Sequence, residues 1–287
     1  MRPVTTLERF WLCYCAAVSV AALCAGGGGG DGHAVLPFVA VHAVVAALQC
    51  VPAVLRRSGR PRGARLAQAL LACGGLPVVF SALALVLPHL HPEPFECAWY
   101  RLDVRLFGTE STAAARAWLP AAAVLPLQLV YASFYLVPIA AGLLVLRARG
   151  AAAFDRAVAI LVGGFLCSYA GYVWFPTLAP KVVLPLGVTD GSGFAATVRA
   201  AIDSAEANPW DCFPSGHTML SVTSAIVVWR WSRRQLPFVL AVVVPLIAST
   251  VCLRYHWPID VVAGALLAWP CVRLCDWLLD RDGAAAA

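Results

Sequence analysis

Two short segments of the sequence combine a histidine with residues that suit the binding of an anion. The first covers residues 211–218 (DCFPSGHT), directly before a long apolar run. Ser215 can cap the start of a helix, Gly216 lets a ligand approach the backbone closely, and the free amides of a first helical turn attract an anion. His217 would face that anion. The alternative is a capped helix whose histidine only lies among the headgroups of a bilayer.

The second segment, residues 253–260 (LRYHWPID), has a carboxylate four positions after a histidine. Pro258 suits the first turn of a helix, and the helix dipole stabilises Asp260 there. Asp260 can accept the proton of one ring nitrogen of His256, which leaves the other nitrogen free to attack. The spacing therefore predicts a nucleophile and the residue that orients it. The alternative is an interfacial histidine beside a capping aspartate.

The two segments are more informative together than apart. Both are expected at amino-terminal ends of helices that open on one face of the molecule. Two positive helix ends, Arg254 and both histidines would then converge on one anion. Ionisable residues at membrane depth are costly, so they indicate a functional site by default.

The composition shows that these segments belong to a membrane protein. Of the 287 residues, 61% are hydrophobic and only 13% are charged, and the mean hydropathy is +0.79. These values exclude a soluble globular domain of this size. Eight apolar runs are long enough to cross about 30 Å of hydrocarbon, which predicts an all-α polytopic bundle of about eight transmembrane helices. The predicted spans are 10–28, 34–55, 66–88, 118–146, 154–175, 214–231, 236–253 and 258–279.

The basic residues predict how the chain is oriented. Of the 21 Lys and Arg residues, 15 fall at the two ends and in alternate connections. The positive-inside rule therefore predicts that both termini are cytoplasmic and that both histidine segments lie on the extracytoplasmic face. Basic residues of a membrane protein report topology first, and we find no nucleic-acid signature, so no nucleic-acid partner is expected. The other loops hold Arg101, Arg105, Arg116, Lys181, Arg199 and Arg254.

The two histidine motifs resemble those of a known superfamily. The sequence PSGH at 214–217, followed by His256 and Asp260 in an HxxxD spacing, resembles the second and third motifs of the type 2 phosphatidic acid phosphatase superfamily. That superfamily includes lipid phosphate phosphatases, undecaprenyl pyrophosphate phosphatases and vanadium haloperoxidases. The resemblance implies a six-helix core over residues 66–279. The remaining parts are two additional transmembrane helices at 1–65 and a tail at 280–287.

The resemblance also implies a role for each motif residue. His256 would attack phosphorus and become a phosphohistidine, with Asp260 orienting its ring. His217 would protonate the leaving oxygen and later activate the acceptor. Ser215 and the amide of Gly216 would bind phosphoryl oxygens. No metal and no other cofactor is implied.

Two cations of the family pattern are missing from their usual positions. The third motif usually has an arginine six residues before the nucleophilic histidine, where this chain has Thr250. Arg254 is our candidate to replace it. The first motif, a lysine followed seven positions later by Arg-Pro, is replaced by FPTLAPK at 175–181. Lys181 is the candidate for this second phosphate contact, and the alternative is an interfacial lysine without a role.

Further segments are similar to the group that contains inositol phosphorylceramide synthases, in which the phosphohistidine passes its group to an alcohol instead of water. We therefore expect a membrane enzyme that acts on a lipid phosphate or phosphodiester, by hydrolysis or by transfer to an alcohol or inositol-type acceptor. The competing hypothesis is a non-catalytic lipid-binding or transport protein on the same fold. Such a protein is expected to lose His217, His256 or Asp260, and all three are present. The oligomeric state is not predicted. The similar segments are 103–108, 131–135, 175–181 and 250–260.

Overall fold

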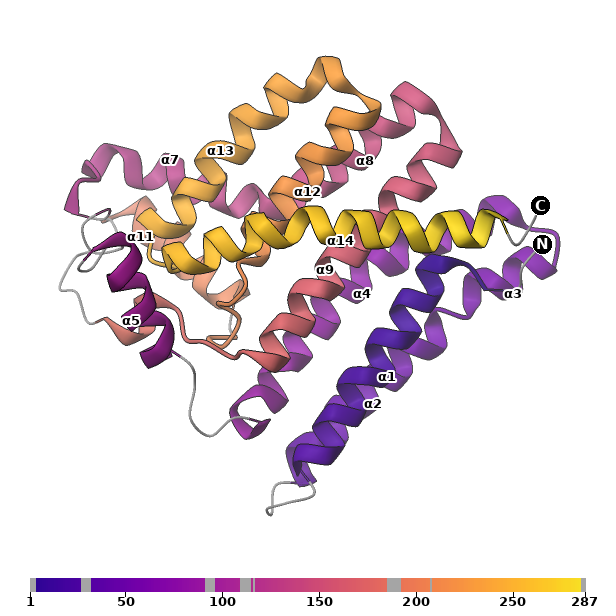
Figure 1. Ribbon diagram of the computed structural model, residues 1–287, viewed down its shortest axis with the longest axis horizontal. Helices are drawn as coiled ribbons and strands as arrows, with labels where there is room; N and C mark the ends of the chain where they lie inside the picture. Colours follow the sequence, from indigo (N-terminus) through magenta and orange to yellow (C-terminus); the bar gives the residue numbers. More distant parts are fainter. Residues whose placement is uncertain are drawn as a thin grey trace.

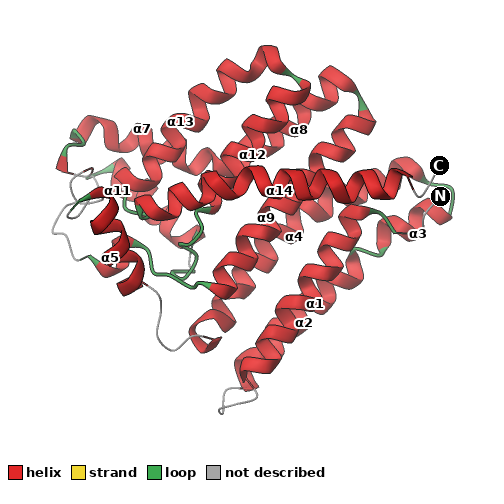
Figure 2. Cartoon of the chain, in the orientation of Figure 1, coloured by secondary structure: helices red, strands yellow, loops and turns green. Residues whose placement is uncertain are grey.

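The computed structural model describes residues 4–26, 32–90, 96–108, 115, 117–184, 192–206 and 208–284. Within these ranges the regular structure is helical and no strand is present, apart from one isolated bridge between Thr177 and Asp211 (Figure 2). The prediction of an all-α polytopic bundle is confirmed. The helices are α1 (Thr6–Gly26), α2 (Gly32–Leu48), α3 (Val51–Arg57), α4 (Pro61–Leu90), α5 (Glu96–Phe107), α7 (Ala121–Ala132), η1 (Ser133–Tyr135), α8 (Leu136–Arg149), α9 (Ala151–Trp174), α10 (Pro180–Val183), α11 (Phe194–Ala205), α12 (Gly216–Trp231), η2 (Arg233–Gln235), α13 (Leu236–Cys252) and α14 (Pro258–Ala284).

Among the described residues, seven helical segments are long and apolar enough to cross a membrane, and the protein is a multi-pass membrane protein. They correspond to seven of the eight predicted spans. The remaining predicted span, 214–231, is α12. Its 16 residues rise only about 24 Å at 1.5 Å per residue, less than the hydrocarbon thickness of about 30 Å. The seven segments are Thr6–Cys24, Val35–Arg57, Pro61–Leu90, Ala121–Arg149, Ala151–Trp174, Arg233–Cys252 and Pro258–Arg281.

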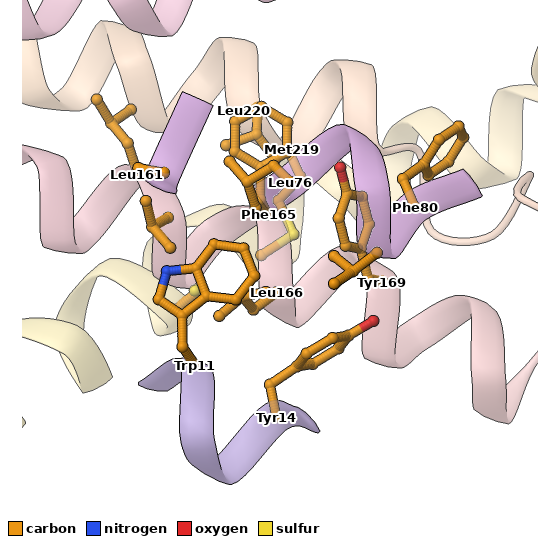
Figure 3. Packing of buried hydrophobic residues seen from close by; sticks show 14 of the residues in the cluster. Trp11, Tyr14, Leu76, Phe80, Leu161, Phe165, Leu166, Tyr169, Met219 and Leu220 are labelled. Atoms are coloured by element: carbon orange, nitrogen blue, oxygen red, sulfur yellow. The ribbon is translucent and has the colours of Figure 1, made fainter. Parts of the chain in front are cut away.

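Helix α9 lies in the middle of the bundle and packs against α1, α4, α8, α12 and α14. Aromatic residues fill much of this core, and Figure 3 shows Trp11 and Tyr14 of α1 beside Phe165 and Tyr169 of α9. A glycine permits one of the closest approaches, because a Cβ atom at Gly163 would lie only 2.5 Å from Sγ of Cys275 in α14. Helix α9 therefore fixes α12 and α14, which carry the two histidine motifs.

Both chain ends lie at one end of the bundle, whereas α5 and α11 lie toward the other (Figure 1). The amino-terminal helices α1 and α2 pack on each other, α1 also contacts α4 and α9, and α2 contacts α4. This packing attaches the first two membrane helices firmly to the rest of the bundle. The division into additional helices at 1–65, a core at 66–279 and a tail stays a prediction.

Candidate active site

The two motif segments meet where α12 and α14 begin side by side. Ser215 caps α12 as expected, since its Oγ accepts a hydrogen bond of 3.2 Å from the amide of Thr218. The amide of Ser215 also donates to the carbonyl of Asp260, at 3.0 Å. Gly264 allows this contact between helices, because a Cβ atom there would lie 2.5 Å from the carbonyl oxygen of Ser215. The starts of the two helices are thereby joined, as the motifs predicted.

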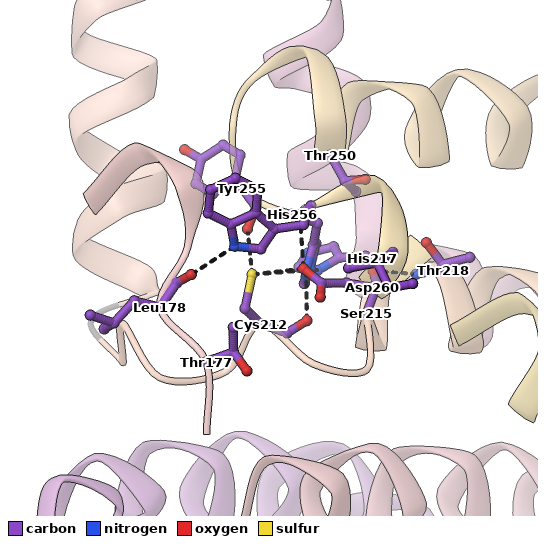
Figure 4. A network of polar contacts seen from close by, with 12 residues as sticks. Thr177, Leu178, Cys212, Ser215, His217, Thr218, Thr250, Tyr255, His256 and Asp260 are labelled. Atoms are coloured by element: carbon purple, nitrogen blue, oxygen red, sulfur yellow. Dashed lines mark hydrogen bonds and ion pairs between the residues drawn. The ribbon is translucent and has the colours of Figure 1, made fainter. Parts of the chain in front are cut away.

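His256 is held by acceptors on one side of its ring (Figure 4). Its Nδ1 lies 3.0 Å from the carbonyl oxygen of Cys212 and 3.6 Å from Oδ2 of Asp260. The same Oδ2 is fixed by the amide of Trp257 at 2.8 Å and by the thiol of Cys212 at 3.0 Å. Two acceptors beside Nδ1 favour the tautomer with its proton on Nδ1, which leaves a lone pair on Nε2.

The lone pair of His256 faces His217. Nε2 of His256 and Nδ1 of His217 are 3.4 Å apart. On the other side of the ring, Nε2 of His217 lies 3.3 Å from Oε1 of Glu206. This distance suits an ion pair, but the angle at the two atoms does not suit a hydrogen bond. The ring of His217 stacks on Tyr131 with centroids 4.5 Å apart and contacts Phe134 at 4.1 Å. His217 is therefore placed to exchange a proton beside Nε2 of His256.

Glu206, which follows α11, is a site residue that the sequence did not reveal. Its Oε2 accepts a hydrogen bond of 2.6 Å from the hydroxyl of Tyr131. Burial raises the pKa of Glu206, but the contacts with His217 and Tyr131 outweigh burial and hold this pKa below its ordinary value. An ionised Glu206 stabilises the protonated imidazolium of His217. Glu206 therefore places a negative charge beside the ring of His217.

The predicted phosphate-binding cations lie in different surroundings. Nζ of Lys181 bonds Oδ1 of Asp203 at 2.6 Å and lies 4.2 Å from the ring centroid of Tyr255. Arg199 contacts the same ring at 4.3 Å and bonds Oδ2 of Asp203 at 3.0 Å. Tyr255 in turn stacks on Tyr131 at 4.2 Å. Lys181 and Arg199 thus lie beside the aromatic stack that supports His217, and Arg199 was not among the predicted site residues.

Arg254 is buried and adopts a left-handed backbone conformation, with φ at 64°. Its Nη1 donates to the carbonyl of Leu184 at 3.4 Å, and its own carbonyl accepts from the amide of Lys181 at 3.0 Å. The segment with Arg254 is therefore joined to the segment with Lys181. At the position of the family's missing arginine, the carbonyl of Thr250 accepts from the amides of Tyr255 and His256, at 2.8 and 3.0 Å.

Three of the segments that resemble one branch of the superfamily contribute to this site. Tyr131 and Phe134 enclose His217, as described above. Asp103 accepts a hydrogen bond of 2.9 Å from the amide of Ile259, at the start of α14. The carbonyl of Leu178 accepts from the indole of Trp257 at 3.0 Å. These segments therefore support the two histidine motifs from α5, α7 and the loop after α9.

One group in the described part of the chain could hold a metal ion. Ligand atoms of Cys212, His256 and Asp260 lie within 4.8 Å of one another. A sulfur, nitrogen and oxygen set of this kind suits zinc. A metal bound there would compete with the contacts between Asp260 and His256 that orient the ring. The expectation that the site works without a metal stays a prediction.

Asp211 is a second carboxyl group whose importance the sequence did not reveal. Burial, and next the charge of Glu206, raise the pKa of Asp211 to about 7. A carboxyl group whose pKa is raised on folding binds its proton more tightly in the folded state, so it destabilises the fold as pH rises from about 4 to about 7. Asp211 therefore makes the stability depend on pH near neutrality.

We expect Asp211→Asn to remove this dependence. The thermal midpoint of the purified wild type should fall between pH 5 and pH 8, and the variant should show a flatter profile, as measured by scanning fluorimetry. Asp280→Asn is the matched control, because Asp280 is 68% exposed and lies at the far end of α14. Equal slopes in the wild type and in Asp211→Asn would contradict the assignment.

Comparisons with known proteins agree with the motifs. The PAP2 superfamily matches residues 99–274. Phosphatidylglycerophosphatase B of Escherichia coli K12 is 34% identical over 74 residues, which are 24% of this chain and 29% of that protein. A PA-phosphatase related-family protein of Dictyostelium discoideum is 31% identical over 118 residues, 35% of this chain and 21% of that protein. The chain thus spans less than a third of the length of these curated relatives, and no solved structure matches.

Because the superfamily match covers more than half of the sequence, the chain belongs to the PAP2 superfamily, as its histidine motifs predicted.

Proposed function

We propose that the protein is an integral membrane enzyme that transfers the phosphoryl group of a lipid phosphate or phosphodiester through a phosphohistidine on His256. One observation carries this proposal. The Nδ1 side of His256 is held by Cys212 and Asp260, while Nε2 faces the Nδ1 atom of His217 at 3.4 Å. This is a nucleophile with an orienting carboxylate and a neighbouring acid. The phosphatase names of the two relatives support phosphate chemistry.

The proposed reaction has two steps. Nε2 of His256 attacks phosphorus, the bond to the leaving oxygen breaks, and His217 gives that oxygen a proton. In-line displacement places the leaving oxygen on the far side of phosphorus, so the two rings must separate when substrate binds. Water or an alcohol then gives a proton to His217 and attacks the phosphohistidine, which frees His256 for another cycle.

The residues at the start of α12 suit the oxygens of the phosphoryl group. Oγ of Ser215 already accepts a hydrogen bond from Thr218, so its hydroxyl proton remains available for a phosphoryl oxygen. The amide of Gly216 belongs to a first helical turn, where the positive end of the dipole favours an anion. We therefore assign Ser215 and Gly216 to phosphate binding.

The decisive experiment incubates the purified full-length protein with several lipid phosphates and phosphodiesters, with and without alcohol acceptors such as inositol. Release of inorganic phosphate without an acceptor would identify a phosphatase. A new phosphodiester that requires the alcohol would identify a transferase of the kind found among inositol phosphorylceramide synthases. An absence of turnover and of any phosphoenzyme, across all substrates, would favour the lipid-binding or transport alternative.

The cations near the site should matter strongly. We expect Lys181→Ala and Arg254→Ala each to lower turnover by about 10² or more, the range seen when one charge-stabilising donor is removed. Arg105→Ala is the matched control, since Arg105 is an exposed basic residue of α5. Initial rates at saturating substrate provide the measurement. Near-normal turnover in either variant would mean that another cation binds the phosphate, and Arg199 would be the next to test.

We further propose that both termini are cytoplasmic and that the active site opens on the extracytoplasmic face. The distribution of basic residues supports this orientation. In a background without other reactive cysteines, a cysteine at exposed Ser58 should resist an impermeant thiol reagent applied to intact cells. A cysteine at exposed Ser192 should react. The reverse pattern of labelling would place the active site in the cytoplasm.

A further inference from the structure

A hollow lies at the end of the bundle that carries both chain termini, away from His217 and His256. This cavity of about 580 Å³ lies among α1, α3, α4 and α9, and we call it the polar cavity for the charged side chains that stand among the apolar residues of its wall. Its wall includes the side chains of Arg56, Arg65, Gln68, Asp155 and Arg156. Arg56, Arg65 and Arg156 each pair with a carboxylate, that of Glu8, Asp155 and Asp276 respectively, so an anion would bind here through guanidinium donors that these ion pairs leave free.

The arginines keep hydrogen-bonding capacity for such an anion. Arg65 uses Nε to bond Oδ1 of Asp155 at 3.1 Å, and among the described residues its two terminal amino groups make no further bond. Arg56 uses Nη2 to bond the buried Glu8 at 2.6 Å. The planar fork of a guanidinium matches two oxygens of a phosphate. A phosphate group can therefore bind here while both ion pairs stay in place.

An apolar groove continues from this polar cavity into the membrane region. It has a volume of about 350 Å³, lies among α4, α8 and α9, and shares Ala69, Phe154 and Val158 with the polar cavity. None of the described residues that line it is charged. Along α4, the wall runs from Arg65 to Pro77, which is about 18 Å at 1.5 Å per residue. This length is close to one leaflet, half of about 30 Å of hydrocarbon.

We propose that this continuous groove binds an anionic phospholipid, with its phosphate at Arg56 and Arg65 and one acyl chain in the apolar section. The polar end, the apolar continuation and a length of one leaflet together match a lipid better than a free anion. Basic pockets between membrane helices are suited to such headgroups. The bound lipid joins the amino-terminal helices to α9, and this role is separate from the proposed catalysis.

The test uses the full-length protein in detergent and measures bound lipid by native mass spectrometry after titration with phosphatidylglycerol or phosphatidylcholine. We expect phosphatidylglycerol to bind at least tenfold more tightly. Arg65→Gln should weaken this binding about tenfold, since it removes charged hydrogen bonds. Arg62→Gln is the control, because Arg62 is exposed about one turn before Arg65 in α4 and lies outside the cavity wall.

A second pair of variants tests the apolar section. Gly142 lines the groove, and its ideal Cβ position lies 3.4 Å from the ring of Phe154, so Gly142→Leu should fill the groove and displace the lipid. Gly74→Leu is the control, since a Cβ atom at Gly74 meets nothing within 4 Å and Gly74 does not line this groove. Equal binding of both lipids, or normal binding in both Arg65→Gln and Gly142→Leu, would overturn the proposal. Full competition by inorganic phosphate would also overturn it, in favour of a simple anion site.

Discussion

The variant His256→Ala should lose both turnover and the trapped phosphoenzyme, with a fall in rate of about 10⁴ or more, as when a nucleophile is removed from a catalytic unit. The nearest alternative nucleophile is the thiol of Cys212, 3.5 Å from Nδ1 of the ring. Burial, together with the charge of Asp260, raises the pKa of Cys212 well above its ordinary value. This thiol is therefore un-ionised at neutral pH and cannot replace the histidine.

The measurement is a quench of the enzyme in alkaline detergent during turnover of a substrate labelled in its phosphate. Label on the wild-type protein should be stable to alkali and labile to acid, as expected for a phosphohistidine. His89→Ala is the control, because His89 is exposed near the end of α4. Label that persists in His256→Ala, or normal activity of that variant, would exclude the proposed covalent step.

The second large effect concerns His217 and depends on the leaving group. His217→Ala should slow the release of a poor alkoxide by 10² to 10⁴, the range for general acid catalysis. A nitrophenyl phosphate ester needs little protonation to leave, so this substrate should partly escape the defect. Equal losses with both substrates would show that His217 serves a role other than proton transfer.

Glu206→Gln tests the carboxylate that faces Nε2 of His217. Removal of the carboxylate takes away the negative charge that faces the imidazolium. The rate with a poor leaving group should therefore begin to fall at a lower pH than in the wild type. A rate profile between pH 5 and pH 9 measures this shift. A lower rate at every pH with an unmoved profile would indicate a purely structural role.

The sequence predicted those parts of the site that depend on local signals. The cap at Ser215, the proline at the start of α14 and the spacing of four between His256 and Asp260 are all properties of a single helix end. The long apolar runs likewise predicted the membrane spans. Each of these features can be deduced without knowing which helices are neighbours, because local backbone geometry determines them.

Glu206 and Arg199 could not be found in this way. Glu206 follows α11 in a loop without a periodic pattern, and it reaches His217 only because α11 packs on α7. Arg199 reaches Tyr255 from another turn of α11. Arg254 and Lys181 lie within the segments that correspond to family motifs, whereas Arg199 lies outside them. Contacts between distant segments depend on tertiary packing.

The shortness of α12 has a consequence for how a lipid would reach His217. If Trp231 marks one boundary of the hydrocarbon, the first turn of α12 lies about 6 Å inside the other boundary. A lipid whose phosphate binds at this depth would not have to move out of the bilayer toward water to reach His217. Lifting only four methylenes out of the hydrocarbon costs about 3 kcal/mol at about 0.8 kcal/mol each, a factor of roughly 10² in rate. By receiving the headgroup at this depth, the enzyme would leave the acyl chains in the bilayer throughout the reaction.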